Sequence, residues 1–120
     1  MRYNYREHWE QGQQHEKFAR TCTQSDWAVV ARFYAALHYV QAYFALQKNY
    51  PQKHSDRNQM MRADPILGSV HLQYQSLEQA SRQARYSCQQ PNDFKSDLES
   101  LTQKMDNVRD AVAARLPNIE

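Results

Sequence analysis

The segment at residues 25–47 constrains the fold of this chain more than any other. Its sequence, SDWAVVARFYAALHYVQAYFALQ, is apolar or aromatic at almost every position and contains neither glycine nor proline. Such a run predicts one long helix with Ser25 or Asp26 as its N-cap. The helix should end at about Lys48, because Pro51 disfavours helical backbone at the residue before it. Since the helix is apolar all round, we expect neighbouring elements to cover most of its sides.

The rest of the chain also favours helices. Its 120 residues include only two glycines and four prolines, too few for the turns of a β-protein. Further helices are expected in four places: about 5–21, a short stretch capped by Ser55, about 67–88, and a stretch capped by Asn92. In the last of these the apolar residues step by four and three: Phe94, Leu98, Leu101, Met105, Val108 and Val112. The chain is therefore predicted to be one all-α domain over residues 1–120, an up-and-down four-helix bundle with an additional short helix.

Positive charge is concentrated in one segment of the chain. The formal net charge of the whole sequence is only +2. The segment 48–62 carries Lys48, Lys53, Arg57 and Arg62 against the single acid Asp56, a net of +3, so the remainder sums to −1. A local basic excess of this kind is typical of a surface that binds phosphate or nucleic acid.

Several classes of protein are disfavoured by spacing. The two cysteines, Cys22 and Cys88, and the five histidines lack metal-ligand spacing, and no glycine-rich phosphate loop is present. We therefore expect no metal and no cofactor. The first residues, MRYNYREHWEQ, lack the apolar stretch of a signal peptide, and polar residues interrupt the longest apolar run. These features predict a reduced, cytoplasmic protein without a membrane span.

Arg32 and His38 interrupt the long apolar helix but cannot act as a pair. Six positions correspond to 600°, so the two side chains leave the helix about 120° apart. His38 is expected on an inward stripe with Trp27. Arg32 is expected on the side of Tyr39 and Tyr43, which we interpret as facing solvent or a second copy of the chain.

The helix expected over 67–88 has an inner face that begins apolar and becomes polar. Its members are Leu67, Val70, His71, Tyr74, Leu77, Ser81, Arg85 and Cys88. A buried Arg85 needs a carboxylate, carbonyl or ligand partner, or must border a cleft. In one interpretation Arg85, Tyr74, Tyr34 and His38 form a satisfied structural network. In the other they line a pocket that His54 and Arg57, the first and last residues of the sequence HSDR, also reach.

The order of these residues resembles a known family. The pattern is W at 27, FYAALH at 33–38, A at 42, H and R at 54 and 57, Y and L at 74 and 77, and S with ARY at 81–86. It resembles the HEPN family, specifically its small stand-alone bacterial members. The resemblance implies a HEPN-like helical bundle that commonly forms a homodimer and is often encoded in toxin–antitoxin or defence modules. Many members are metal-independent ribonucleases in which an arginine precedes a histidine by four to six residues.

This chain departs from the catalytic pattern of the family. No histidine follows Arg82 and Arg85, and the stretch from Arg32 to His38 fits only by count. A relocated site would use His54 to move a proton, with Arg57 or Arg85 holding the phosphate. The candidate catalytic residues are therefore His54, Arg57 and Arg85. The candidate ligand-binding or RNA-binding residues are His38, Lys53, Arg82 and Tyr86.

Three functions follow from this reading of the residues. The first is a non-catalytic module that binds RNA, a nucleotide or a partner protein encoded nearby. The second is a metal-independent endoribonuclease with a non-standard His and Arg site. The third is a structural, oligomeric helical protein whose polar residues form only an internal network. The first is the function that the departure from the catalytic pattern favours.

Overall fold

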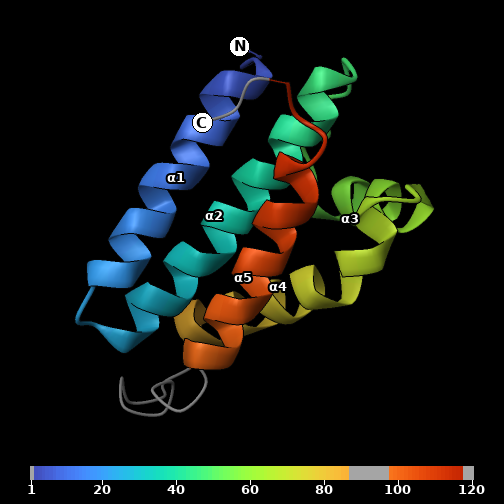
Figure 1. Cartoon of the computed structure of the whole chain (residues 1–120). Helices are drawn as coiled ribbons and strands as arrows, with labels where there is room; N and C mark the ends of the chain where they lie inside the picture. Colours follow the sequence, from blue (N-terminus) through green and yellow to red (C-terminus); the bar gives the residue numbers. More distant parts are fainter. Residues whose placement is uncertain (1, 87–97, 118–120) are drawn as a thin grey trace.

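Helices are the only regular secondary structure in the part of the chain that the computed structural model describes, residues 2–86 and 98–117. The elements are α1 (Tyr5–Thr21), α2 (Ser25–Leu46), α3 (His54–Ala63), the 3₁₀ helix η1 (Leu67–Val70), α4 (His71–Tyr86) and α5 (Leu98–Ala113). The prediction of an all-α fold is confirmed. In Figure 1, α1, α2 and α5 run alongside one another, whereas α4 crosses them obliquely and α3 lies to one side.

The long apolar helix is the centre of the fold. α2 packs against α1, α4 and α5, so three other helices cover it, as its all-round apolar pattern predicts. Phe33, Val40 and Phe44 are among its fully buried residues. No helix in the described part of the chain is both long enough and apolar enough to cross a membrane.

The helix ends agree with the sequence in part. α1 has the predicted bounds. Its start is fixed by a capping box, in which the side chains of Asn4 and Glu7 each accept a hydrogen bond from the other's backbone N–H, at 2.8 and 2.9 Å respectively. α2 instead begins at Ser25 with Gln24 as its N-cap, and α3 begins at His54 with Lys53 as its N-cap. The predicted caps at Ser25 or Asp26 and at Ser55 are therefore wrong. In neither helix does the N-cap side chain make a capping hydrogen bond, so a capping pattern could not mark the start.

The helix expected over 67–88 is divided. Its first four residues form η1, and the α-helix begins at His71. Asp64 anchors the entry, since its Oδ1 accepts backbone N–H bonds from Ile66 and Leu67 at 2.8 and 2.9 Å. The Asn92 cap and Phe94 lie outside the described residues. The inner face predicted for this helix is confirmed as far as Arg85.

The two tyrosines expected on a dimer surface are buried within one chain. Tyr39 is 0% exposed, packs on Trp9 with ring centroids 4.7 Å apart, and donates from Oη to Glu16 at 2.8 Å. Tyr43 is 6% exposed and donates to the carboxylate of Asp64 at 2.9 Å. The interpretation of this side of α2 as an oligomer surface is therefore wrong, because α1 and the α3–η1 connection already cover it.

Arg32 is also buried, contrary to the expectation that it faces solvent. It is 7% exposed, and its Nε donates to Thr102 Oγ1 at 2.8 Å. Its Nη1 donates to the carbonyl oxygens of Ala28 at 2.9 Å and Ala19 at 3.2 Å. Arg32 thus ties α2 to the end of α1 and to α5. These acceptors satisfy the guanidinium by hydrogen bonds, which a buried cation requires.

Trp27 is exposed, although it was expected to face inward. It is 57% exposed, and with Phe18, which is 52% exposed, it lines a shallow, mainly apolar hollow between α1 and α2 of about 490 Å³. A helix that is apolar on every side offers no pattern to show which stripe remains uncovered.

The close approach of α1 and α2 generates a test of stability. A Cβ added at Gly12 would lie 2.6 Å from Tyr39 Cε1, whereas one at Gly68 would lie 3.4 Å from the nearest atom, the Arg62 carbonyl oxygen. We expect Gly12→Ala to lower the free energy of unfolding by about 1–3 kcal/mol through overpacking. Gly68→Ala, the matched control, should change it by less than about 1 kcal/mol. Urea unfolding of both variants measures this, and equal effects would contradict the packing argument.

Candidate functional site

His54 lies at the start of α3, beside the residues predicted to act with it. Its Nδ1 is 3.1 Å from Nη1 of Arg57 and 3.2 Å from Oε2 of Glu78. Arg57 follows one helical turn later, a spacing that brings the two side chains together on α3. The His54 side chain is 47% exposed, so the remaining edge of its ring is open to a ligand.

Arg57 is the buried cation beneath this histidine. It is 4% exposed, and its Nη2 donates to the carbonyl oxygen of Pro51 at 3.4 Å. Its Nε has no hydrogen-bond partner among the described protein groups. A buried guanidinium with incomplete hydrogen bonding is costly. Its positive charge acts strongly on neighbouring groups because little water screens it.

Glu78 completes the site and was missed by the sequence reasoning. It is 8% exposed, and its Oε1 accepts a bond from Asn58 Nδ2 at 3.1 Å. Asn58 Oδ1 is in turn 2.8 Å from Nε2 of His71, so a polar chain runs from α3 to the start of α4. The available signal was a lone acid one helical turn before Arg82, next to the inner face of α4.

The Nδ1 atom of His54 has two competing partners. The N–H of Arg57 needs a bare nitrogen as acceptor, whereas the carboxylate of Glu78 needs an N–H donor. One tautomer can serve only one of them. When Nδ1–H donates to Glu78, the lone pair at Nε2 is free toward solvent.

His54 is held in its neutral form. Burial lowers its pKa first, then the positive charge of Arg57, while Glu78 acts in the opposite direction. Arg85 and Arg82 add smaller lowering effects. The positive charges of three arginines thus oppose protonation of the ring. A neutral imidazole beside a carboxylate can accept a proton at neutral pH.

Arg85 finds the kind of partner that its position on the inner face of α4 requires. Its Nη1 donates to Tyr34 Oη at 3.2 Å, and its Nε to the carbonyl oxygen of Ser81 at 3.4 Å. The guanidinium carbon lies 5.1 Å from the ring centre of Tyr86. Arg85 is thereby fixed between α2 and the end of α4.

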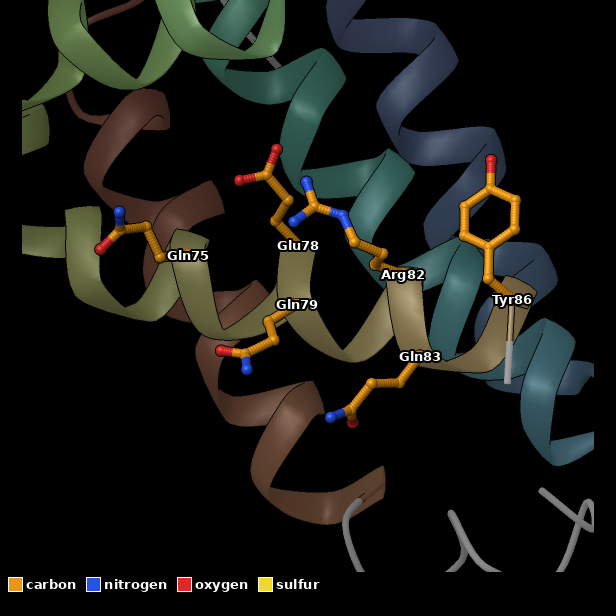
Figure 2. A pocket seen from close by; sticks show the side chains of 6 residues that line it. All are labelled: Gln75, Glu78, Gln79, Arg82, Gln83 and Tyr86. Carbon is orange, nitrogen blue, oxygen red and sulfur yellow. The ribbon is translucent and has the colours of Figure 1, made fainter. Parts of the chain in front are cut away.

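Arg82 and Tyr86 extend outward from the same helix. Both are exposed, and with Glu78 they line a hollow of about 550 Å³ on the surface of α4. Figure 2 shows Glu78 and Arg82 projecting on the same side of α4, with the Tyr86 ring farther along the helix. Lys53 is exposed at the N-cap of α3, next to His54. The structure therefore brings His54, Arg57 and Glu78 together where α3 packs on α4, with Arg82 one turn and Arg85 and Tyr86 about two turns farther along α4 than Glu78.

His38 belongs to a separate cluster with α1. Its Nδ1 is 3.2 Å from Nδ1 of His8, and its ring stacks on His15 with centroids 5.3 Å apart and planes 11° from parallel. His15 lies in turn 5.9 Å from the ring of Tyr34, which accepts the bond from Arg85. His38 thus joins the site only through the chain of His15 and Tyr34 to Arg85, and it lines different hollows from those on α4.

Two further polar groups lie behind the site. The hydroxyl oxygens of Tyr74 and Ser81, both 0% exposed residues, have no hydrogen-bond partner among the described protein groups. Each such group costs about 1–3 kcal/mol when buried. Two buried hydroxyl groups beneath α3 and α4 are therefore left without hydrogen bonds to the described residues, which is unusual in a folded protein.

No family model, no curated protein and no solved structure matches this chain. Within residues 2–86 and 98–117, no group of three or more His, Cys, Asp or Glu residues is placed to hold a metal ion.

The histidine cluster generates a prediction about pH. Burial, and then the charges of His15, His8 and Arg57, lower the pKa of His38 from 6.5 to about 4. The unfolded chain takes up this proton near the ordinary pKa, whereas the folded chain resists it. The stabilisation is thus complete above pH 6.5 and is lost as the pH falls toward about 4.

We expect the free energy of unfolding to fall by about 1–2 kcal/mol between about pH 7 and about pH 4.5, a range discounted for the partial exposure of the ring. The variant His38→Gln should show a smaller fall, although the pKa values of His8 and His15 are also lowered, mainly by burial, and act in the same direction. Urea unfolding at both pH values measures the difference. An identical fall in both proteins would contradict this assignment.

Proposed function

We propose that this chain binds RNA or a nucleotide by its phosphate at the junction of α3 and α4. The observation that carries the proposal is the exposed ring of His54 lying 3.1 Å from the buried guanidinium of Arg57, beside α4, which contributes Glu78 to the same site and carries two further arginines, Arg82 and Arg85. The resemblance to the HEPN family supports the same ligand class. A HEPN-like fold is part of this proposal.

The individual groups suit an oxyanion ligand. A guanidinium is planar and offers paired N–H donors that match two phosphate oxygens. Arg82 is exposed and free to move toward a ligand, while the bonds to Tyr34 and Ser81 hold Arg85 in place. The first turn of α3 adds backbone N–H groups and the positive end of a helix dipole beside His54.

A second candidate function is metal-independent cleavage of RNA. The contact that favours it is the 3.2 Å approach of His54 Nδ1 to Glu78. With Nδ1–H donating to Glu78, Nε2 would take the proton of a ribose 2′-hydroxyl. The 2′-oxygen would then attack phosphorus and the bond to the 5′-oxygen would break, giving a 2′,3′-cyclic phosphate and a 5′-hydroxyl that takes its proton from water. Arginine would stabilise the negative charge on the phosphoryl oxygens.

The remaining expectations from the sequence and from the resemblance are also part of the proposal. They are a homodimer, a partner protein encoded nearby, a cytoplasmic location and a place in a toxin–antitoxin or defence module. With Tyr39 and Tyr43 buried, Phe18 and Trp27 are the exposed apolar side chains that a second copy would cover. A purely structural role predicts instead that the site binds no RNA.

The binding proposal is tested with labelled single-stranded RNA and fluorescence anisotropy. We expect Arg82→Ala to weaken binding about tenfold, equivalent to about 1.4 kcal/mol, because it removes one phosphate contact. Arg6→Ala on α1 makes the same charge change far from the site in the sequence and should have an effect of less than about twofold. Equal losses in both variants, or no binding by folded protein, would argue against the proposed site.

The cleavage candidate is tested with the same RNA in the presence of EDTA. We expect His54→Ala to reduce the rate at least about 100-fold and Glu78→Gln to reduce it less, since Glu78 only orients the ring. Circular dichroism establishes that both variants remain folded. If the folded wild-type protein does not cut, this candidate is rejected and the binding proposal stands by itself.

A further inference from the structure

The exposed side of α4 carries more than a phosphate contact. Six residues line its hollow of about 550 Å³: Gln75, Glu78, Gln79, Arg82, Gln83 and Tyr86. At 100° per residue they occupy one face about 140° wide. Figure 2 shows this face with Glu78, Arg82 and Tyr86 on one side and Gln79 and Gln83 turned to the other. The hollow is thus a track along the helix, and its lining mixes one cation, one acid, three amides and a phenol.

The track is longer than a single nucleotide. Gln75 and Tyr86 are eleven positions apart, which corresponds to about 16 Å along a helix. A stacked nucleic-acid strand advances about 3.4 Å per nucleotide, so about five nucleotides would span it. A ligand that uses the whole track is therefore an oligomer.

Tyr86 provides a stacking surface at one end of the track. It is 76% exposed, the second most exposed large hydrophobic side chain after Leu72 among the described residues. Its ring lies 5.1 Å from the guanidinium carbon of Arg85, which limits its freedom without covering it. An exposed ring beside cations is the arrangement on which unpaired bases stack.

The charges along the track favour contacts to bases as well as to phosphate. Arg82 is the one cation in the lining, and Glu78 is the one acid. The three glutamines offer amide donors and acceptors that match the hydrogen-bonding edges of bases. Such edges are accessible in a single strand, whereas a double helix pairs them and covers the faces of its bases.

We infer that the ligand is single-stranded RNA lying lengthwise along α4, with one phosphate at Arg82 and one base stacked on Tyr86. This inference rests on the proposed function and specifies its substrate class. The glutamines provide contacts that tolerate different bases.

The test compares a labelled uridine hexamer with uridine monophosphate as a competitor. We expect the hexamer to bind at least about tenfold more tightly than the monophosphate, because only the hexamer also extends from Arg82 toward Gln75, about 10 Å along the helix. Tyr86→Ala should weaken hexamer binding about tenfold, whereas Tyr86→Phe should retain binding. Tyr3→Ala, at an exposed tyrosine outside the track, is the matched control and should bind as the wild type does.

Salt dependence separates the two contacts. Each phosphate contact to a single strand adds about −0.7 to the slope of log affinity against log salt concentration. Arg82→Ala should therefore make the slope about 0.7 less negative, and Tyr86→Ala should leave the slope unchanged.

The outcomes distinguish this inference from the proposed function. If the monophosphate binds as tightly as the hexamer, or Tyr86→Ala leaves hexamer binding intact while Arg82→Ala weakens it, the track is rejected and the phosphate site remains. If folded protein binds neither probe, the proposed function itself is overturned. A hairpin duplex that competes as well as the hexamer also overturns the single-strand inference.

Discussion

The contact of Tyr39 with Gly12 and Glu16 is the constraint on which the rest of the bundle depends. The missing side chain at Gly12 lets the Tyr39 ring lie directly against α1, where it also packs on Trp9. Its hydroxyl donates to Glu16, which also accepts from Arg20 and Arg109, the latter on α5. Burial favours the neutral acid, but the bond from Tyr39 and the neighbouring guanidiniums lower the pKa of Glu16 and keep it ionised. One carboxylate therefore joins three helices.

The opposite side of α2 positions the candidate site. Phe33 lies between the two halves of that site, with its ring 5.6 Å from Tyr74 on α4 and 6.0 Å from His54 on α3. Since Phe33 is 0% exposed, the separation of α3 from α4 is set by a packed side chain. The polar groups thus act from a rigid support, which lowers the cost of ordering them around a ligand.

The faces of a helix could be predicted where polar and apolar residues alternate with the helical period, and could not be predicted where they do not. The inner face of α4 was predictable because its residues recur every three or four positions. The proximity of His54 to Arg57 follows from their spacing of three positions in one helix. In α2 nearly every stripe is apolar, so the pattern carried no information about which neighbour covers which side. For this reason Trp27, Arg32 and the two tyrosines were misplaced. Glu78 was missed because its role depends on α3 packing beside it.

The double claim on Nδ1 of His54 has a consequence for the unliganded protein. A donor from Arg57 and an acceptor from Glu78 cannot both be satisfied at this one atom, so either tautomer leaves one of the two groups without its partner there, and in this structure Glu78 Oε2 is the one without a hydrogen bond to a described residue. An anion held at the proposed site would change the electrostatic balance between these two tautomers. The ring nitrogens of His54 would then report whether the proposed site is occupied.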